Sequence, residues 1–306
     1  MLALDLGVLN RGARVISLKR ALGWSVFCVL LALAFSGVVY GLYHYRWGGL
    51  NSGPAPLSGE TALLQFLTCW LVEQALSLDN VFVIALIFAY FRVPREYQHR
   101  ALFWGIVGAL LMRAAMIVAG AALIARFDWI VYVFGGLLVV SALKMLWLHD
   151  EHLEPDRNPL VRLARCFFPV SPRFDGERFF TRVDGRLAMT PLFVALIVIE
   201  SSDVIFAVDS IPAVFGFTRD PFIVFTSNVF AILNLRTLYF ALSGLLAHFR
   251  YLKHSLVVVL LFVGVKMLLE HHVHIRIDLS LAFIAVVLAA GMIASRLAAP
   301  RPVRQS

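Results

Sequence analysis

Long apolar runs alternate with short polar segments along most of the chain. Several of these runs reach the roughly 18–20 residues that an α-helix needs to cross the hydrocarbon core of a bilayer. The pattern therefore predicts an all-α fold, a polytopic membrane helical bundle of about eight spans. The expected spans lie near residues 22–43, 62–91, 101–125, 129–148, 190–217, 221–248, 255–270 and 279–298.

One longer polar segment, residues 149–189, separates the fourth expected span from the fifth and contains four of the prolines. We interpret it as a cytoplasmic linker that carries a short amphipathic helix around "LVRLARCFF". It divides the chain into parts that we assign as an N-terminal segment with the first span (1–60), a first repeat (61–148), the linker (149–189), a second repeat (190–270), and the last span with a tail (271–306).

The two halves look like repeats of three spans each. "SLDNVFVI" (77–84) resembles "AVDSIPAV" (207–214), and each central Asp has another acid six residues before it. Because each repeat has an odd number of spans, the two repeats are expected to be inverted in the membrane, as in many secondary transporters. The matched pairs are Glu73 with Asp203, Asp79 with Asp209, Arg113 with Arg236, and Lys144 with Lys266.

Composition agrees with a membrane protein, because 60% of the residues are hydrophobic, 15% are charged and the mean hydropathy is +0.83. The net charge of +8 comes from Arg and Lys in alternate loops, which fits the positive-inside rule better than nucleic-acid binding. This alternation predicts a multi-pass protein of the bacterial inner membrane with a cytoplasmic C-terminus. The three cysteines suggest neither a disulfide framework nor a thiolate metal cluster.

Five acids fall inside expected spans, and each would cost roughly 2.5–3.5 kcal/mol if it faced lipid at the bilayer centre. They must therefore face counter-charges, water or a bound cation. Arg113 and Arg236 are the expected charge partners, and they could neutralise two of the acids as purely structural salt bridges. The acids are Glu73, Asp79, Glu200, Asp203 and Asp209.

The expected spans also carry amide oxygen donors, since Asn80 lies in span 62–91 with Glu73 and Asp79, and Asn228 lies in span 221–248. Such donors suit Mg²⁺, Ca²⁺ and Mn²⁺ rather than Cu⁺ or Zn²⁺.

Two acids six residues apart lie about 120° apart around a straight helix. We therefore expect a break at Pro212, which would leave the carbonyl of Val208 beside Asp209 without its helical partner. Asp79 and Asp209 are the main expected ligands.

No P-loop, nucleophile elbow or dinucleotide fingerprint occurs, so the chain is not expected to be an enzyme. "HDEHLEPD" (149–156) and "HHVH" (271–274) are interpreted as solvated polar segments, with metal binding as the alternative. Two functions stay open at this point. One is a transporter of a divalent cation, with protonation of the same acids as a way to drive release of the ion. The other is a membrane scaffold whose acids are locked in salt bridges.

The segments "SLDNVFVIALIF", "SSDVIFAVDSIPAVF" and "DPFIVFTSNVFAILNLRTLYFAL" closely resemble the TerC family of bacterial integral membrane proteins, and most of all its Alx-type members. The resemblance implies an inverted-repeat fold of the lysine-exporter-like superfamily and a function in manganese export, tellurite resistance or metal supply. It implies no permanently bound cofactor, a transported Mn²⁺ ion as substrate, and the bilayer as the surrounding partner. The oligomeric state is not indicated.

One departure from the family pattern concerns the first residues. Family members usually begin with an additional span that leads into an "LDL" segment. Here "MLALDLGVLNRG" looks like the end of that span, so either the start of the chain is misassigned or most of the helix before Asp5 has been lost.

Overall fold

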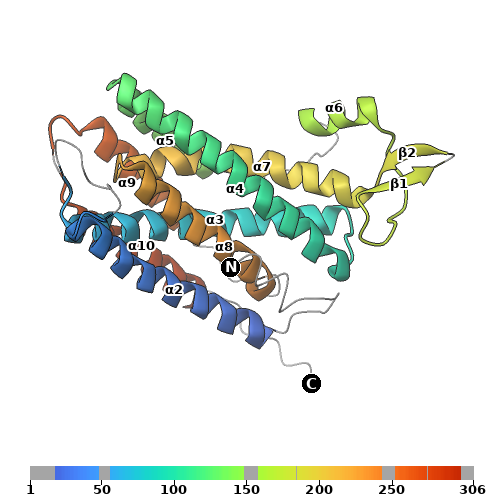
Figure 1. The fold of residues 1–306 in the computed structure, drawn as a ribbon, viewed down its shortest axis with the longest axis horizontal. Helices are drawn as coiled ribbons and strands as arrows, with labels where there is room; N and C mark the ends of the chain where they lie inside the picture. Colours follow the sequence, from blue (N-terminus) through green and yellow to red (C-terminus); the bar gives the residue numbers. More distant parts are fainter. Residues whose placement is uncertain are drawn as a thin grey trace.

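Helices make up most of the described part of the protein in a computed structural model, and they lie side by side as an elongated bundle (Figure 1). The structure describes residues 18–47, 56–147, 158–183, 185–242, 252–273 and 275–297. Seven of its helices are long and apolar enough to cross a membrane. The predicted polytopic helical membrane fold is therefore confirmed. Asp5 and the "HDEHLEPD" segment lie outside the described residues.

Each of the eight expected spans corresponds to a helix. The bundle owes its stability to apolar faces that pack inward, while many large apolar side chains point outward, as a lipid-facing surface requires. The shortest of the eight is α9, with 17 residues. The eight helices are α2 (Leu18–His44), α3 (Gly59–Tyr90), α4 (Arg95–Arg126), α5 (Ile130–Trp147), α7 (Pro191–Phe215), α8 (Pro221–Leu242), α9 (Leu252–Leu268) and α10 (Ile277–Leu297).

The linker between the halves contains more structure than the sequence predicted. The expected amphipathic helix is present as α6 (Pro159–Phe167), whose first turn is capped by the side chain of Asn158. An antiparallel hairpin of β1 (Phe180–Val183) and β2 (Arg186–Met189) follows and was not anticipated. Both elements lie at one end of the bundle (Figure 1), which we call the hairpin end.

The centre of the bundle is formed by α3 and α7, which run in opposite directions. Helix α4 packs against α7, and α8 packs against α3. Helices α5 and α9 approach closely at Gly135 and Gly264. A Cβ atom on either glycine would lie only 2.9 Å from the carbonyl oxygen of the other. Small residues commonly allow such close helix contacts in membranes.

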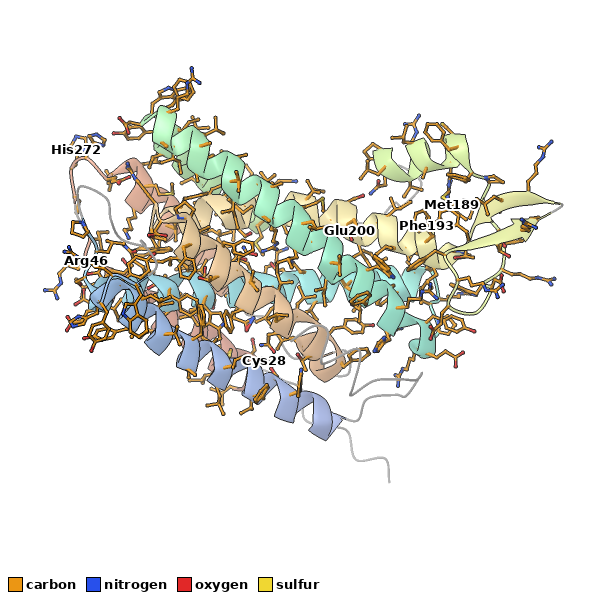
Figure 2. All side chains as sticks on the ribbon, in the orientation of Figure 1. Cys28, Arg46, Met189, Phe193, Glu200 and His272 are labelled. Atoms are coloured by element: carbon orange, nitrogen blue, oxygen red, sulfur yellow. The ribbon has the colours of Figure 1, made fainter. Side chains whose placement is uncertain are left out.

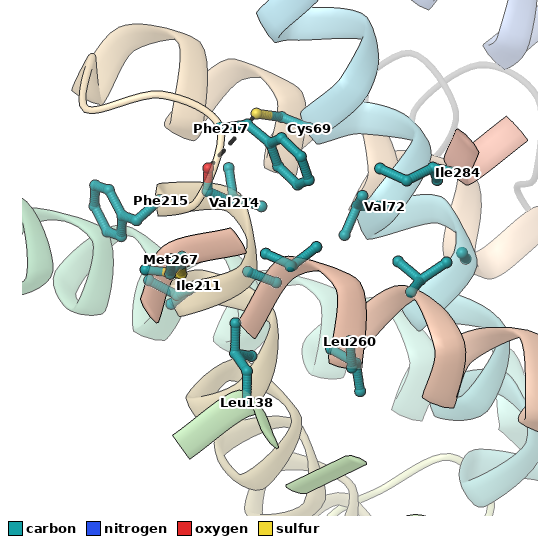
Figure 3. Packing of buried hydrophobic residues seen from close by; sticks show 14 of the residues in the cluster. Cys69, Val72, Leu138, Ile211, Val214, Phe215, Phe217, Leu260, Met267 and Ile284 are labelled. Atoms are coloured by element: carbon teal, nitrogen blue, oxygen red, sulfur yellow. Dashed lines mark hydrogen bonds between the residues drawn. The ribbon is translucent and has the colours of Figure 1, made fainter. Parts of the chain in front are cut away.

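Away from the hairpin end, the core is apolar (Figure 3). The side chains of Val72, Leu138 and Leu260 pack together there with residues from the end of α7. In the same region the thiol of Cys69 lies 3.9 Å from the carbonyl oxygen of Val214. This weak contact links α3 to the last turns of α7.

Helix α7 continues through Pro212 to Phe215 without an unwound turn. The expected break beside Asp209 was therefore wrong. Proline removes one backbone donor and crowds the preceding turn, but neighbouring helices hold such a helix together in a membrane protein. Residues of α7 around the proline are buried, so packing outweighs the local cost.

Candidate cation site within the helical bundle

A buried guanidinium lies at the meeting point of α3, α4, α7 and α8. Arg113 of α4 has 1% of its surface exposed, and its Nη1 donates to the Oε2 atom of Glu73 on α3 at 2.7 Å. Its Nε and Nη2 donate to the two carboxylate oxygens of Asp203 on α7 at 3.4 and 3.3 Å. One cation thus serves two buried acids, which leaves one formal negative charge when both acids are ionised. We call these residues the Arg113 cluster.

Two amides complete the Arg113 cluster. The Nδ2 atom of Asn228 on α8 donates to the Oε1 atom of Glu73 at 2.8 Å. The Nδ2 atom of Asn80 on α3 donates to the Oδ1 atom of Asp203 at 3.4 Å. Each carboxylate therefore contacts the guanidinium and one amide, and the helices that contribute these groups are held together by charge-assisted hydrogen bonds.

Helical periodicity explains why α3 places Glu73 and Asn80 in the same cluster. Residues four and seven positions after Glu73 lie on the same face, and these are Ser77 and Asn80. All three are buried. Asp79 falls about 100° away from Asn80 around the helix, so it points in a different direction.

A small cavity of about 30 Å³ adjoins the Arg113 cluster. Its polar lining comes from Asn80, Ser202 and Asp203, and the rest is apolar side chains of α3, α4, α7 and α8. The volume suffices for about two water molecules, since one needs roughly 10–15 Å³ by this measure. The Oδ1 atom of Asn80 is buried here without a hydrogen-bond partner among the described residues.

Asp209 lies apart from the Arg113 cluster. Its carboxylate accepts a hydrogen bond of 2.6 Å from the hydroxyl of Ser141 on α5. Lys144, one turn further along α5, also interacts with it electrostatically. Asp209 therefore forms a second polar contact, between α5 and α7, that the structure does not join to Asp203.

Asp79 and Glu200 each lie in a different environment outside the Arg113 cluster. Asp79 is half-buried and interacts electrostatically with Lys253 at the start of α9. Glu200 lies near the middle of α7 (Figure 2) and has no hydrogen-bond or ion-pair partner in the described part of the chain. Its carboxylate lies against Gly108 of α4, where any Cβ atom would overlap it.

The sequence predicted one site containing all the acids, whereas the structure places the acids in several different surroundings. Glu73, Asp203, Asn80, Asn228 and Arg113 come together. Asp79 and Asp209 interact with other groups, and Glu200 interacts with Asp203 only electrostatically. Within the described residues, no three His, Cys, Asp or Glu side chains converge closely enough to hold a metal ion. The side chain of Arg236 lies outside the described part of the structure.

Several contacts were missed from the sequence. Ser141 and Gly108 gave no sequence signal, because their roles depend on which helix lies opposite. By contrast, the spacing from Glu73 to Ser77 and Asn80 could have shown which polar residues share a face of α3. In the "HHVH" segment, the hydroxyl of Tyr132 and the Nδ1 atom of His271 form a hydrogen bond of 2.7 Å, and His274 is not described.

The fold and the Arg113 cluster define the class of this chain as a multi-pass membrane protein with a buried charge network between its spans. The chain belongs to the family described as "Integral membrane protein TerC family", which it matches over residues 58–302.

Relatives extend over almost the whole chain. An uncharacterized membrane protein of Myxococcus xanthus is 49% identical over 96% of this chain and 88% of its own length. Alx of Escherichia coli (strain K12), named as a proposed membrane-bound redox modulator, is 44% identical over 93% of this chain and 87% of its own length. An uncharacterized membrane protein of Rickettsia bellii is 38% identical over 96% of this chain and 93% of its own length. No solved structure matches the chain.

Proposed function

We propose that this TerC family protein is a divalent metal ion transporter of the bacterial inner membrane, that its substrate is Mn²⁺ and that it exports this ion. The observation that carries the proposal is the Arg113 cluster with its adjoining cavity. Two buried carboxylates share one guanidinium, and the unpaired amide oxygen of Asn80 lies beside them. A hard divalent cation would supply the missing positive charge and take these oxygen ligands.

The site offers only part of the oxygen ligands that a divalent cation needs. Asp203 and Asn80 offer carboxylate and amide oxygens at the cavity wall. The cavity is large enough for water, and Mn²⁺ commonly keeps water among its oxygen ligands. Movement of Glu200 or Asp79 toward the cavity would add a further carboxylate during transport.

The direction and the repeat arrangement are also part of the proposal. Arg173, Arg178 and Arg182 lie at the hairpin end, so the positive-inside rule assigns this end and the C-terminus to the cytoplasm. The packing of α4 on α7 resembles that of α8 on α3, as two inverted repeats would produce. Rocking of such repeats around a central site is the usual basis of alternating access.

The test is Mn²⁺ efflux from cells that lack their own manganese exporters. We would compare the unaltered protein with its Asp203→Asn, Asp79→Asn and Asp209→Asn forms at matched abundance in the membrane. We expect cellular manganese to fall with the unaltered protein and to stay high with Asp203→Asn. If all four proteins give the same manganese content, the transport proposal is wrong. If only Asp79→Asn and Asp209→Asn abolish efflux, the transported ion uses those acids instead of the Arg113 cluster.

A second candidate function is a membrane scaffold or a tellurite-resistance factor without transport. The observation in its favour is that Arg113 already contacts both buried acids, which makes the cluster a stable ion-pair network without any metal. A scaffold should bind no divalent cation, and each acid-to-amide change should lower its stability. Equilibrium binding of Mn²⁺ to the purified protein separates the two candidates.

The name of the Alx relatives raises a redox role as well. The three cysteines of this chain lie on three different helices, α2, α3 and α6, without a disulfide between them, and two of them, Cys28 and Cys69, are buried. A dithiol redox centre needs two cysteines close enough to form a disulfide. We therefore propose that any redox effect follows from the metal that the protein moves.

A further inference from the structure

Arg113 holds its two acids unequally. The contact to Glu73 is 2.7 Å, and Asn228 supports the other oxygen of Glu73 at 2.8 Å. The contacts to Asp203 are 3.3 and 3.4 Å, and Asn80 adds only a further contact of 3.4 Å. Charge-assisted hydrogen bonds are strongest at about 2.7–2.9 Å. Glu73 is therefore the tight partner of Arg113 and Asp203 the loose one.

The loose partner is also the accessible one. Asp203 lines the cavity, and its side chain is 11% exposed, whereas that of Glu73 is completely buried. Asn80 lies beside Asp203 in the same wall, only 3% exposed, with its Oδ1 atom unpaired. Asp203 thus lines a space in which a cation would compete with the guanidinium for its carboxylate.

We propose that Arg113 is an internal competitor of the transported cation, which displaces it from Asp203 while Glu73 retains it. This inference rests on the proposed function, because it assumes that a divalent cation enters the cavity. Each carboxylate keeps a cationic partner in this exchange, since the arriving cation replaces the guanidinium at Asp203 and the guanidinium remains paired with Glu73. The same residue would then neutralise the site when it is empty and set the affinity of the site for its substrate.

Competition by Arg113 predicts a result that the net charge of the Arg113 cluster alone does not predict. With both acids ionised, the unaltered cluster carries one formal negative charge. The Glu73→Gln form carries none, and Arg113 has only Asp203 left as a carboxylate partner. The double form Glu73→Gln/Arg113→Gln again carries one negative charge, but Asp203 is now free of its competitor. If only net charge mattered, the double form would bind a cation as tightly as the unaltered protein does.

The experiment measures the Kd for Mn²⁺ of the full-length protein in lipid nanodiscs, using the electron paramagnetic resonance signal of the free ion. We expect Glu73→Gln to raise the Kd on the order of tenfold and the double form to bind on the order of tenfold more tightly than the unaltered protein, as couplings between sites commonly do. Asp203→Asn should abolish binding. Arg126→Gln removes a cation from the exposed end of the same helix and should leave the Kd unchanged.

The outcomes distinguish the inference from the function on which it rests. Equal Kd values for the unaltered protein and the double form would overturn the competition, even though Mn²⁺ binding itself would stand. An unchanged Kd in Glu73→Gln would overturn the competition as well. Because this variant retains Arg113, it still tests the inference if the double form fails to fold. If the unaltered protein binds no Mn²⁺, both the proposed function and the inference are wrong.

Discussion

Asp203 and Asp209 lie six residues apart on the same helix, yet their surroundings differ in kind. Asp203 meets a guanidinium and an amide in a buried cluster to which four helices contribute. Asp209 meets one hydroxyl, from Ser141 of α5, and is only half-buried. An acid in a membrane span can thus be either part of the internal framework or a half-buried side chain with one hydrogen-bonding hydroxyl and one nearby lysine, and its position in the sequence does not reveal which.

The difference should appear in stability. Removing one partner from a buried ion pair leaves an uncompensated charge, and this costs far more than the pair itself contributes. Removing a neutral hydroxyl partner from a half-buried acid costs little, because water can replace it. The comparison therefore predicts a strong dependence of folding on Arg113 and a weak dependence on Ser141.

The largest effect is expected from Arg113→Met. Glu73 and Asp203 would lose their shared cation inside the bundle, and the free energy of unfolding should fall by about 3–5 kcal/mol. Unfolding of the purified protein in mixed detergent micelles measures this change. Arg126→Met, on the exposed end of the same helix, is the matched control and should change stability little. A loss below about 1 kcal/mol for Arg113→Met, the range of exposed ion pairs, would show that the cluster is not the framework described here.

Much of the fold could be predicted from the sequence, because length and hydropathy alone define a membrane span. The helix at "LVRLARCFF" was also predictable, from its amphipathic pattern and its cap at Asn158. The hairpin of β1 and β2 was not, since two strands of four residues give too short a period-two pattern to recognise. The inverted repeat stays a prediction.

The need for a counter-charge such as Arg113 could be predicted from the sequence, but the acids that Arg113 contacts could not. The cost of five acids in lipid already required counter-charges, and Arg113 was the obvious one. That it would contact both Glu73 and Asp203, from two other helices, depends on how those helices are rotated about their axes. The metal role of the acids stays a prediction. The idea that Asp79 and Asp209 share one point required a break in α7, and the continuous helix does not provide one.

An intermediate effect is expected from Gly108→Ala. The new methyl group would overlap the carboxylate of Glu200, so α4 and α7 must separate slightly or Glu200 must move. Overpacking typically costs about 1–3 kcal/mol, and the loss here should lie near the lower end of that range because the overlapping atoms are the end of a flexible side chain. Gly136→Ala on α5 is the control, because a Cβ atom there meets nothing within 4 Å. It should stabilise its helix by roughly 0.5–1 kcal/mol. Equal effects of the two changes would mean that Glu200 does not occupy the contact with Gly108.

The smallest effect is expected from Ser141→Ala. Asp209 would lose the 2.6 Å hydrogen bond from the hydroxyl, which contributes on the order of 1 kcal/mol. The loss should be partly recovered, because the half-buried carboxylate can take up water and Lys144 still attracts it. The same unfolding assay therefore ranks this change below both Gly108→Ala and Arg113→Met. A loss as large as that of Arg113→Met would show that Asp209 also belongs to the internal framework, and the contrast between the two acids of α7 would disappear.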